Sequence, residues 1–382
     1  MKKNLFTLLF AMVANVGMMN ASVWIDNLEY DLDESNRTAQ VTAGSNDDAG
    51  NITIPSSINY EDKTYTVTSI GESAFKGNSE LVSVTMPNTI TSIGKNAFQG
   101  NHSMTTIVIP NSVISMGDYV FLSCSGLVSV TLSNNLTSIG KEVFHACTSL
   151  ESIDIPNGVT SIGFQAFQGC SNLASVTIPN SVTTIGSGAF WDCSSLTSID
   201  IPNSVTSIER KAFQGCAFSS VIIPNTVTNL EGYAFAKCEN LISVVIPNSI
   251  TSLEEDLFWS CTNLTSVTIP SSVTEIKKAV FLQCTNLNKV INYGETPANA
   301  YSNAFDGVNK STCKLYVPQN SINLYKNAAV WRDFYNVEAV EDVQAIDEVA
   351  TDKVQGVKVV RDGKVLIRKG EKTYTMLGQE VK

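Results

Sequence analysis

Apolar residues recur along most of the chain with a period of 23 residues. In one unit, residues 170–190, the apolar positions are Leu173, Val176, Ile178, Val182, Ile185, Ala189 and Phe190. The first three follow an L-x-x-V-x-I spacing, which predicts a short strand with alternating inward and outward side chains. Pro179 removes a backbone donor and ends that strand, while Gly186 allows the turn that leads to the Ala-Phe pair.

Two landmarks repeat in the same phase as this unit. Proline follows the strand at Pro87, Pro110, Pro156, Pro179, Pro202, Pro224, Pro247 and Pro270, with Ser133 in the one gap. Phenylalanine recurs at Phe75, Phe98, Phe121, Phe144, Phe167, Phe190, Phe213, Phe235, Phe258 and Phe281. One step of each series is 22 residues long, because the unit after Cys216 lacks one residue.

A unit of this size cannot bury its own apolar edge, so neighbouring units must stack. Stacking about ten units in register builds continuous layers of Leu, Val, Ile and Phe, and at about 4.8 Å per strand the stack extends about 50 Å. The pattern therefore predicts a β-rich solenoid. Caps are expected at both ends, since an open end exposes apolar core and unpaired strand edges.

The repeat resembles the bacterial surface type of leucine-rich repeat called BspA-like, with the pattern C-x-x-L-x-x-V-x-I-P-x-x-V-x-x-I-G-x-x-A-F. The match runs over residues 67–290, so the resemblance implies a leucine-rich-repeat solenoid of about ten 23-residue repeats. Residues 22–66 are similar to the N-terminal capping hairpins of that family, and residues 291–337 to its terminal capping repeat. The resemblance also implies adhesion to host matrix proteins, host cells or neighbouring bacteria.

The N-terminus has the features of a secretory signal peptide. Lys2 and Lys3 precede an apolar stretch at residues 5–16, and small residues follow. We therefore expect residues 1–21 to be removed and the protein to be secreted or displayed on the bacterial cell surface. No later apolar stretch approaches the length of a membrane span, so none is predicted.

The overall charge makes nucleic acid a poor partner. Acidic residues outnumber basic ones 36 to 25, which gives a net charge of −11. No basic surplus exists to neutralise phosphates.

Cysteine occupies one position of the repeat, three residues after the phenylalanine. The members are Cys124, Cys147, Cys170, Cys193, Cys216, Cys238, Cys261 and Cys284, and the first two repeats carry Asn78 and Asn101 instead. A position that accepts either residue favours a small side chain that bonds to turn backbone, so we expect buried free thiols. A disulfide between neighbours is the alternative, because one strand spacing is within reach. Cys313 is expected inside the C-terminal cap.

No metal or cofactor is predicted. The sequence has two histidines, no C-x-x-C pair and no phosphate-binding glycine loop. Residues 31–36 faintly resemble a calcium loop, but they lack its glycine and its closing glutamate.

Two columns of outward-facing residues are expected along the strands. The first is Ser83, Thr106, Ser129, Ser152, Ser175, Ser198, Ser220, Ser243 and Ser266, and the second is Thr85, Val108, Thr131, Asp154, Thr177, Asp200, Ile222, Val245 and Thr268. A flat ladder of hydroxyls is a candidate platform for protein or glycan. The alternative is that it reflects β-propensity and solubility alone.

The variable positions lie around the phenylalanine of each repeat. The candidate partner-binding residues there are Trp191, Trp259, Tyr119, His145, Phe164 and Tyr233, with Leu122 and Leu282 at equivalent positions. Large aromatic side chains at exposed turns are typical anchors of binding surfaces. Trp191 and Trp259 hold equivalent positions and are expected on one edge. The alternative is that each tryptophan packs over its neighbour's turn.

The sequence offers little for catalysis. Asp154 and Asp200 share a column two repeats apart, hence about 10 Å by strand spacing, near the separation used by inverting glycosidases. No histidine accompanies them, and neither G-x-S-x-G nor H-E-x-x-H occurs. Solvated surface carboxylates are the simpler interpretation, and we predict a non-catalytic protein.

The C-terminal end differs from the repeats. Residues 338–355 form an acidic linker, and residues 356–382 form a basic segment that alternates like two or three strands. This tail somewhat resembles the β-rich sorting domains of an outer-membrane secretion system, although the usual further strands are absent. It is a candidate sorting segment or a different tail.

Together these features predict an exported, non-catalytic repeat protein that presents an extended surface to an extracellular protein or glycan. An adhesin is the main hypothesis. A carbohydrate-binding accessory protein is the second, with polysaccharide on the Ser/Thr face and tryptophans stacking on sugars, and a glycan hydrolase is the third.

Overall fold

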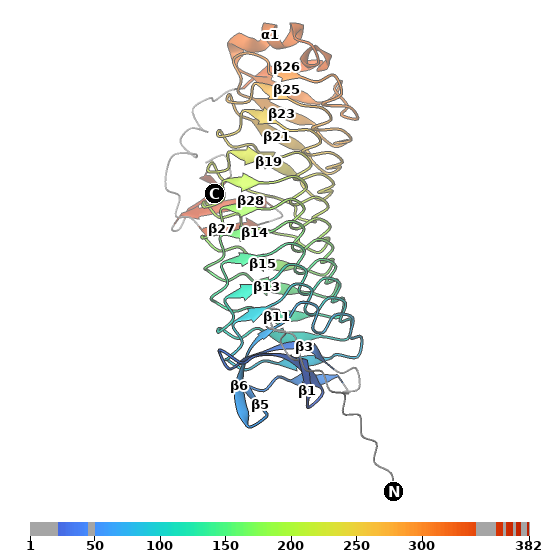
Figure 1. Ribbon diagram of the computed structural model, residues 1–382. Coiled ribbons are helices and arrows are strands. Elements are labelled where there is room, and N and C mark those ends of the chain that lie inside the picture. Colours follow the sequence, from blue (N-terminus) through green and yellow to red (C-terminus); the bar gives the residue numbers. More distant parts are fainter. Residues whose placement is uncertain are drawn as a thin grey trace, which may run out of the picture.

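The computed structural model describes residues 22–44 and 50–340, together with four backbone strands beyond residue 356. The chain winds into a long solenoid of about 12 turns (Figure 1). The predicted signal peptide and residues 341–355 of the predicted acidic linker lie outside the described residues. In the described part of the chain, no helix is long and apolar enough to cross a membrane.

The L-x-x-V-x-I segment of each repeat forms a first parallel ladder, in register from turn to turn. Its strands are β4 (Asn51–Thr53), β7 (Ser83–Thr85), β9 (Thr106–Val108), β11 (Ser129–Thr131), β13 (Ser152–Asp154), β15 (Ser175–Thr177), β19 (Ser243–Val245), β21 (Ser266–Ile269), β23 (Lys289–Asn292), β25 (Lys314–Val317) and β26 (Asn336–Ala339). The ladder starts before residue 67 and continues past residue 290. Its first member was hard to recognise, because Ile52, Ile54 and Pro55 repeat the strand pattern without the cysteine and phenylalanine that mark later units.

A second parallel ladder runs along another face. Its strands are β6 (Lys63–Ile70), β8 (Ser92–Ile93), β10 (Ser115–Met116), β12 (Ser138–Ile139), β14 (Ser161–Ile162), β16 (Thr184–Ile185), β17 (Ser207–Ile208), β18 (Asn229–Leu230), β20 (Ser252–Leu253), β22 (Glu275–Ile276) and β24 (Asn299–Ala300). The inward isoleucine or leucine of these short strands is buried almost throughout.

Both ladders are interrupted, and the interruptions coincide only between β18 and β20. The first has no strand pairing between β7 and β9, where β8 and β10 of the second ladder pair. Between β15 and β19 the first has only a single bridge, Ser220–Ser243, while β16, β17 and β18 continue the second. The second is interrupted between β10 and β12, where β9 and β11 pair, and between β18 and β20. At the β18–β20 level the first ladder contributes only the Ser220–Ser243 bridge. Strand pairing is therefore weakest there, directly after the one-residue deletion that follows Cys216.

A column of stacked phenylalanine rings forms the core. Eleven rings, from Phe75 to Phe305, stack with centroids 5.1–5.8 Å apart and planes within 18°. Backbone hydrogen bonds join the same turns, as from Phe121 N–H to the Val143 carbonyl at 2.9 Å. Ten members of this column follow from the repeat period, and Phe305 in the C-terminal cap is the eleventh.

Both ends of the column are covered. At the N-terminus, β1 (Ser22–Ile25), β2 (Leu28–Asp33) and β3 (Thr38–Gly44) form an antiparallel meander, and β5 (Ser57–Tyr60) lies against β6. At the other end are η1 (Gln319–Ser321), α1 (Ile322–Asn327) and η2 (Trp331–Asp333). The buried Trp331 ring closes the stack, 5.5 Å from Phe305, and its Nε1 donates to the Ala298 carbonyl at 2.8 Å.

The tail contains four antiparallel strands. They are β27 (Val357–Arg361), β28 (Lys364–Lys369), β29 (Lys372–Thr375) and β30 (Glu380–Val381), paired in that order. The sequence pattern predicted two or three strands, and the short last strand was missed because it has only two residues. The role of residues 356–382 in sorting stays a prediction.

Candidate functional site

Two residues with left-handed backbone conformation flank the phenylalanine in the turn of each repeat. For the ten rings from Phe75 to Phe281, the residues two before and two after the ring have positive φ, as at Tyr119 (62°) and Ser123 (60°) around Phe121. We call the residues from four before to two after each ring the turn edge. This edge holds all six candidate partner-binding residues predicted from sequence.

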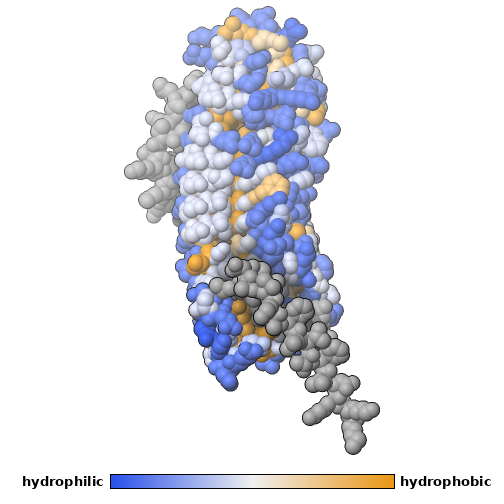
Figure 2. All heavy atoms as spheres, in the orientation of Figure 1, coloured by the Kyte–Doolittle hydropathy of each residue, from blue (hydrophilic) through white to orange (hydrophobic). Residues whose placement is uncertain are grey.

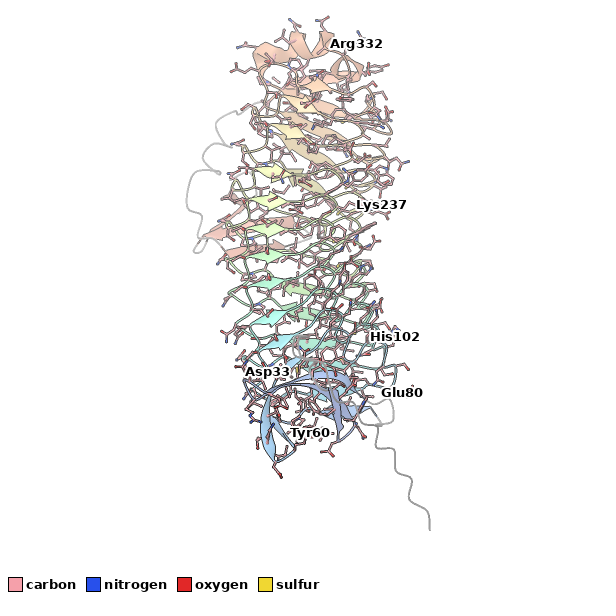
Figure 3. The ribbon with its side chains drawn as sticks, in the orientation of Figure 1. Asp33, Tyr60, Glu80, His102, Lys237 and Arg332 are labelled. Carbon is pink, nitrogen blue, oxygen red and sulfur yellow. The ribbon has the colours of Figure 1, made fainter. Side chains whose placement is uncertain are left out.

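The cations of the repeats are confined to the turn edge. Between residues 64 and 288 the chain has eight basic residues, and all lie on it: Lys76, Lys95, Lys141, Arg210, Lys211, Lys237, Lys277 and Lys278. Figure 2 shows pale columns beside a strongly hydrophilic strip along the long axis, and Lys237 projects from one side in Figure 3. One edge therefore combines the basic and the aromatic side chains of the solenoid.

Aromatic and basic side chains stack on each other in a C-terminal cluster. Lys211 Nζ lies 4.3 Å from the centroid of the Trp191 ring and 5.8 Å from that of Tyr233. The Arg210 guanidinium lies 4.5 Å from the Tyr233 centroid. Tyr233 meets Trp259 edge to face at 6.3 Å, and Lys237 Nζ lies 5.0 Å from the Trp259 centroid.

Both tryptophans are half-buried. Trp191 packs against Lys211 of the next turn. The alternative prediction, that each tryptophan packs over its neighbour's turn, therefore describes part of the environment of Trp191. Trp191 and Trp259 lie on the same edge, as predicted, with Tyr233 between them.

A smaller cluster lies toward the N-terminus. Lys141 Nζ lies 5.3 Å from the Tyr119 centroid and 5.1 Å from the Phe164 centroid, and Lys95 Nζ is 5.5 Å from Tyr119. Phe164 keeps 43% of its surface exposed. His145 lies on the same edge, and its Nδ1 is 3.3 Å from Glu142 Oε2.

Sequence reasoning missed the basic partners of these rings. Three of them could have been found, because Lys141, Arg210 and Lys211 occupy the same turn positions as aromatic residues in other repeats. A cation over an aromatic face is stabilised by about 0.5–1 kcal/mol at exposed sites, so these contacts hold the rings in place.

The predicted hydroxyl columns face solvent for most of their length, but Thr268 is buried. A further exposed threonine column, which the sequence did not reveal, precedes the second ladder: Thr91, Thr137, Thr160, Thr183, Thr206, Thr228, Thr251 and Thr274. In it Thr183 Oγ1 donates to the Thr160 carbonyl at 3.2 Å, and Thr206 Oγ1 to the Thr183 carbonyl at 3.3 Å. Such hydroxyls are engaged within the scaffold, which favours a structural role for this column.

All nine cysteines are free and buried, as expected for the column. Each of the eight repeat thiols donates to the carbonyl of a phenylalanine in a preceding turn, with Sγ···O distances of 3.0–3.2 Å. Burial raises the pKa of Cys170 to about 12. These thiols stay protonated at neutral pH and are not nucleophiles.

The carboxylates considered for catalysis or metal binding have structural partners. Asp154 is exposed, and its Oδ1 accepts from Thr177 Oγ1 at 3.1 Å. Asp33, in the faint calcium-loop match, accepts hydrogen bonds from the side chains of Ser35 and Asn36, which lower its pKa to about 2. In the described ranges, no three His, Cys, Asp or Glu residues are grouped so that they could hold a metal ion.

Comparison with known proteins places the repeats in a family. The chain matches the BspA type leucine rich repeat region in overlapping segments, residues 51–174, 137–217, 160–288 and 206–334. No curated protein matches the chain.

Two solved structures have a similar fold. A leucine rich cell surface protein from Faecalibacterium prausnitzii superposes with a TM-score of 0.54 at 23% identity, covering 88% of this chain and 99% of that one. A leucine-rich repeat protein from Bacteroides ovatus gives 0.53 at 22% identity, covering 84% and 100%. The repeat pattern, the stacked core and the match over residues 51–334 lead to one conclusion: the chain belongs to the BspA type leucine-rich repeat family.

Proposed function

We propose that this protein is an exported, non-catalytic adhesin that binds an extracellular macromolecule through its turn edge. The observation that carries the proposal is the confinement of all eight repeat cations and all six candidate residues to one edge. The scaffold needs the phenylalanine, glycine and cysteine of each turn, but it does not need these exposed rings and charges.

The clusters suit binding because their side chains are already ordered. Trp191, Tyr233 and Trp259 keep exposed surface while neighbouring cations restrict their rotation. Ordered aromatic anchors lose little conformational entropy when a partner covers them. Lys211 and Lys237 lie beside those anchors, but acidic residues of the same turns outnumber the cations, so the proposal rests on the aromatic anchors and not on net charge: Asp192, Glu209, Glu231, Glu254, Glu255 and Asp256.

A location at the cell surface is supported by the fold relative from Faecalibacterium prausnitzii, which is described as a cell surface protein. The charged and apolar pattern of residues 1–21 supports export. Sorting through the C-terminal strands is part of the same proposal.

Replacing both tryptophans tests the proposal. In a screen against arrayed matrix proteins, host cells and bacterial surfaces, the Trp191→Ala/Trp259→Ala variant should bind at least about tenfold more weakly, because central aromatic anchors typically contribute 2 kcal/mol or more. The matched control is Val108→Ala/Thr131→Ala, two exposed neighbours on the first ladder. Thermal unfolding checks that both variants fold.

Equal binding by the tryptophan variant and the native chain would contradict the turn edge as the binding surface. A loss confined to the Val108→Ala/Thr131→Ala variant would move the surface to the strand face.

A further inference from the structure

A groove opens where the strand pairing of the solenoid is weakest. It lies between β18 and β20, which are not hydrogen-bonded neighbours, at the level held by the Ser220–Ser243 bridge. The widest spacing in the phenylalanine column, 5.8 Å between Phe235 and Phe258, joins the same two turns. The groove therefore lies at an interruption of the strand ladders, in the repeat that follows the shortened one.

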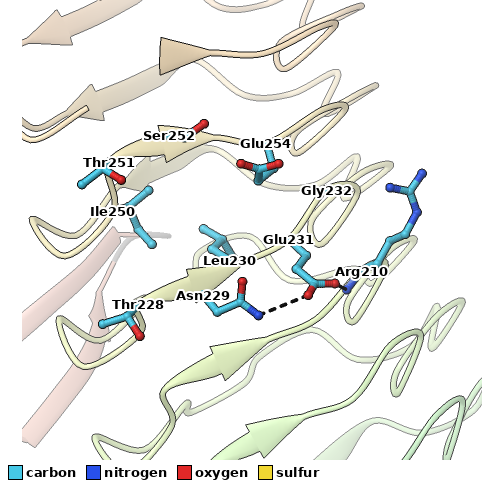
Figure 4. A pocket seen from close by; sticks show the side chains of 10 residues that line it. All are labelled: Arg210, Thr228, Asn229, Leu230, Glu231, Gly232, Ile250, Thr251, Ser252 and Glu254. Atoms are coloured by element: carbon cyan, nitrogen blue, oxygen red, sulfur yellow. Dashed lines mark hydrogen bonds between the residues drawn. The ribbon is translucent and has the colours of Figure 1, made fainter. Parts of the chain in front are cut away.

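Equivalent segments of two successive turns form the walls (Figure 4). The cavity has a volume of about 460 Å³ and is lined by Arg210, Thr228, Asn229, Leu230, Glu231, Gly232, Ile250, Thr251, Ser252 and Glu254. This size is within the range of small-molecule sites, about 300–1,000 Å³. Leu230 and Ile250 are buried, whereas Thr228, Asn229 and Thr251 are exposed, so polar groups surround the opening.

Two residues make this groove chemically different from the other turns. Asn229 stands where the neighbouring strands have Ser207 and Ser252. Glu231 shares a position with Glu209 and Glu254 of the flanking turns, where six earlier turns have glycine, at Gly71, Gly94, Gly117, Gly140, Gly163 and Gly186. The polar wall is thus an addition to the repeat pattern.

The polar side chains are held in place before any ligand arrives. Glu231 Oε2 accepts from Arg210 N–H at 2.9 Å, and Glu231 Oε1 accepts from Asn229 Nδ2 at 3.2 Å. The Arg210 side chain passes Gly232 to reach Glu255 Oε1 at 2.8 Å. A Cβ at Gly232 would lie 2.7 Å from the Glu255 carbonyl, so this crossing requires glycine.

An aromatic rim adjoins one end of the groove. Arg210 and Gly232 belong to the lining, and Arg210 also covers the Tyr233 ring, which in turn meets Trp259. The groove thus lies beside the C-terminal cluster of the turn edge.

The lining selects one class of ligand. Glu231 and Glu254 disfavour an anion, although Arg210 and the Lys277 pairing with Glu254 at 2.8 Å balance their charge. An apolar ligand would remove water from these polar groups without replacing the hydrogen bonds that the water makes. Carboxylate and carbonyl acceptors beside amide, hydroxyl and guanidinium donors instead suit adjacent hydroxyls, each of which donates and accepts.

We propose that this groove binds a neutral sugar ring of a glycan, with its hydroxyls on Asn229, Glu231 and Glu254. This is a different claim from macromolecular binding at the turn edge. It gives the carbohydrate-binding hypothesis a site other than the Ser/Thr face.

Saturation-transfer NMR and calorimetry on the full chain, with neutral hexoses and N-acetylhexosamines as probes, test this site. The native chain should bind at least one probe. The Asn229→Ser/Glu231→Gly variant, which restores the residues found in other turns, should bind it about tenfold more weakly or worse, because hydrogen bonds to a charged group are lost. The control is Thr160→Ala/Ser161→Ala, at the positions equivalent to Thr228 and Asn229, where β14 is hydrogen-bonded to β16.

Several results would overturn the proposal: no binding by the native chain, equal binding by the groove variant, or equal losses in groove and control variants. Capture of an extended peptide in place of sugars would overturn it as well. If the double variant does not fold, Asn229→Ser alone must show the loss. The groove variant should still bind the protein partner in the same samples. Failure of the sugar proposal and failure of the turn-edge proposal therefore give different results.

Discussion

Replacing Phe167 by alanine is expected to lower the free energy of unfolding by about 3–5 kcal/mol. The ring has no exposed surface and stacks on Phe144 at 5.3 Å and on Phe190 at 5.2 Å. Its removal leaves a cavity and breaks two ring contacts in a column where each turn is supported only by its neighbours. Urea unfolding followed by circular dichroism measures the change.

Phe164 provides a matched control three residues away. It is the same residue type in the same turn, but it is 43% exposed and contacts Lys141. Phe164→Ala should therefore cost less than about 1 kcal/mol. Similar losses for the two variants would contradict the assignment of the phenylalanine column as the core.

Stability is expected to collapse as the pH rises above about 9. Burial raises the pKa of Cys124, Cys170 and Cys284 to about 12 and raises those of the other repeat thiols, whereas unfolded thiols titrate near 9. Between these values the native state keeps protons that the unfolded state has released, so stability falls with pH. Each thiol contributes up to about 1.4 kcal/mol per pH unit, so eight can offset the stability of an ordinary domain within one or two units.

The same measurement on a Cys147→Ala/Cys170→Ala/Cys193→Ala variant isolates the thiols from tyrosine and lysine titration. Chemical unfolding from pH 7 to 10.5 in reducing buffer should show a shallower loss than in the native chain. An unchanged slope would contradict the account of the buried thiol column.

The periodicity of the sequence was enough to predict the solenoid. Proline, phenylalanine and cysteine occur in phase, and each has a local physical role: ending a strand, stacking in the core, or donating to turn backbone. The ends were harder, because the units of Ile52 and Phe305 lack the cysteine that marks most repeats. Each cap is hydrogen-bonded to the adjacent repeats, through β3–β6–β8 at the N-terminal end and β23–β25–β26 at the C-terminal end.

The candidate site was predicted only in part. The aromatic positions follow from comparing repeats. Their basic partners depend on which side chain of a neighbouring turn contacts the ring, and the repeat pattern does not specify this. Lys211 over Trp191 and Arg210 passing Gly232 are contacts between turns. The deletion after Cys216 is visible in sequence, yet the groove near Asn229 depends on where strand pairing in the two ladders is interrupted, which the sequence does not show.

Lysine footprinting tests the central claim, that binding takes place on the turn edge, most directly. The bound and free chain would be acylated and each lysine quantified by mass spectrometry, since the repeats carry their cations on this edge alone. Bound partner should protect Lys211 and Lys237 and leave Lys63 and Lys326, which lie in the caps, unchanged. Protection of the cap lysines with full labelling of Lys211 and Lys237 would contradict the account.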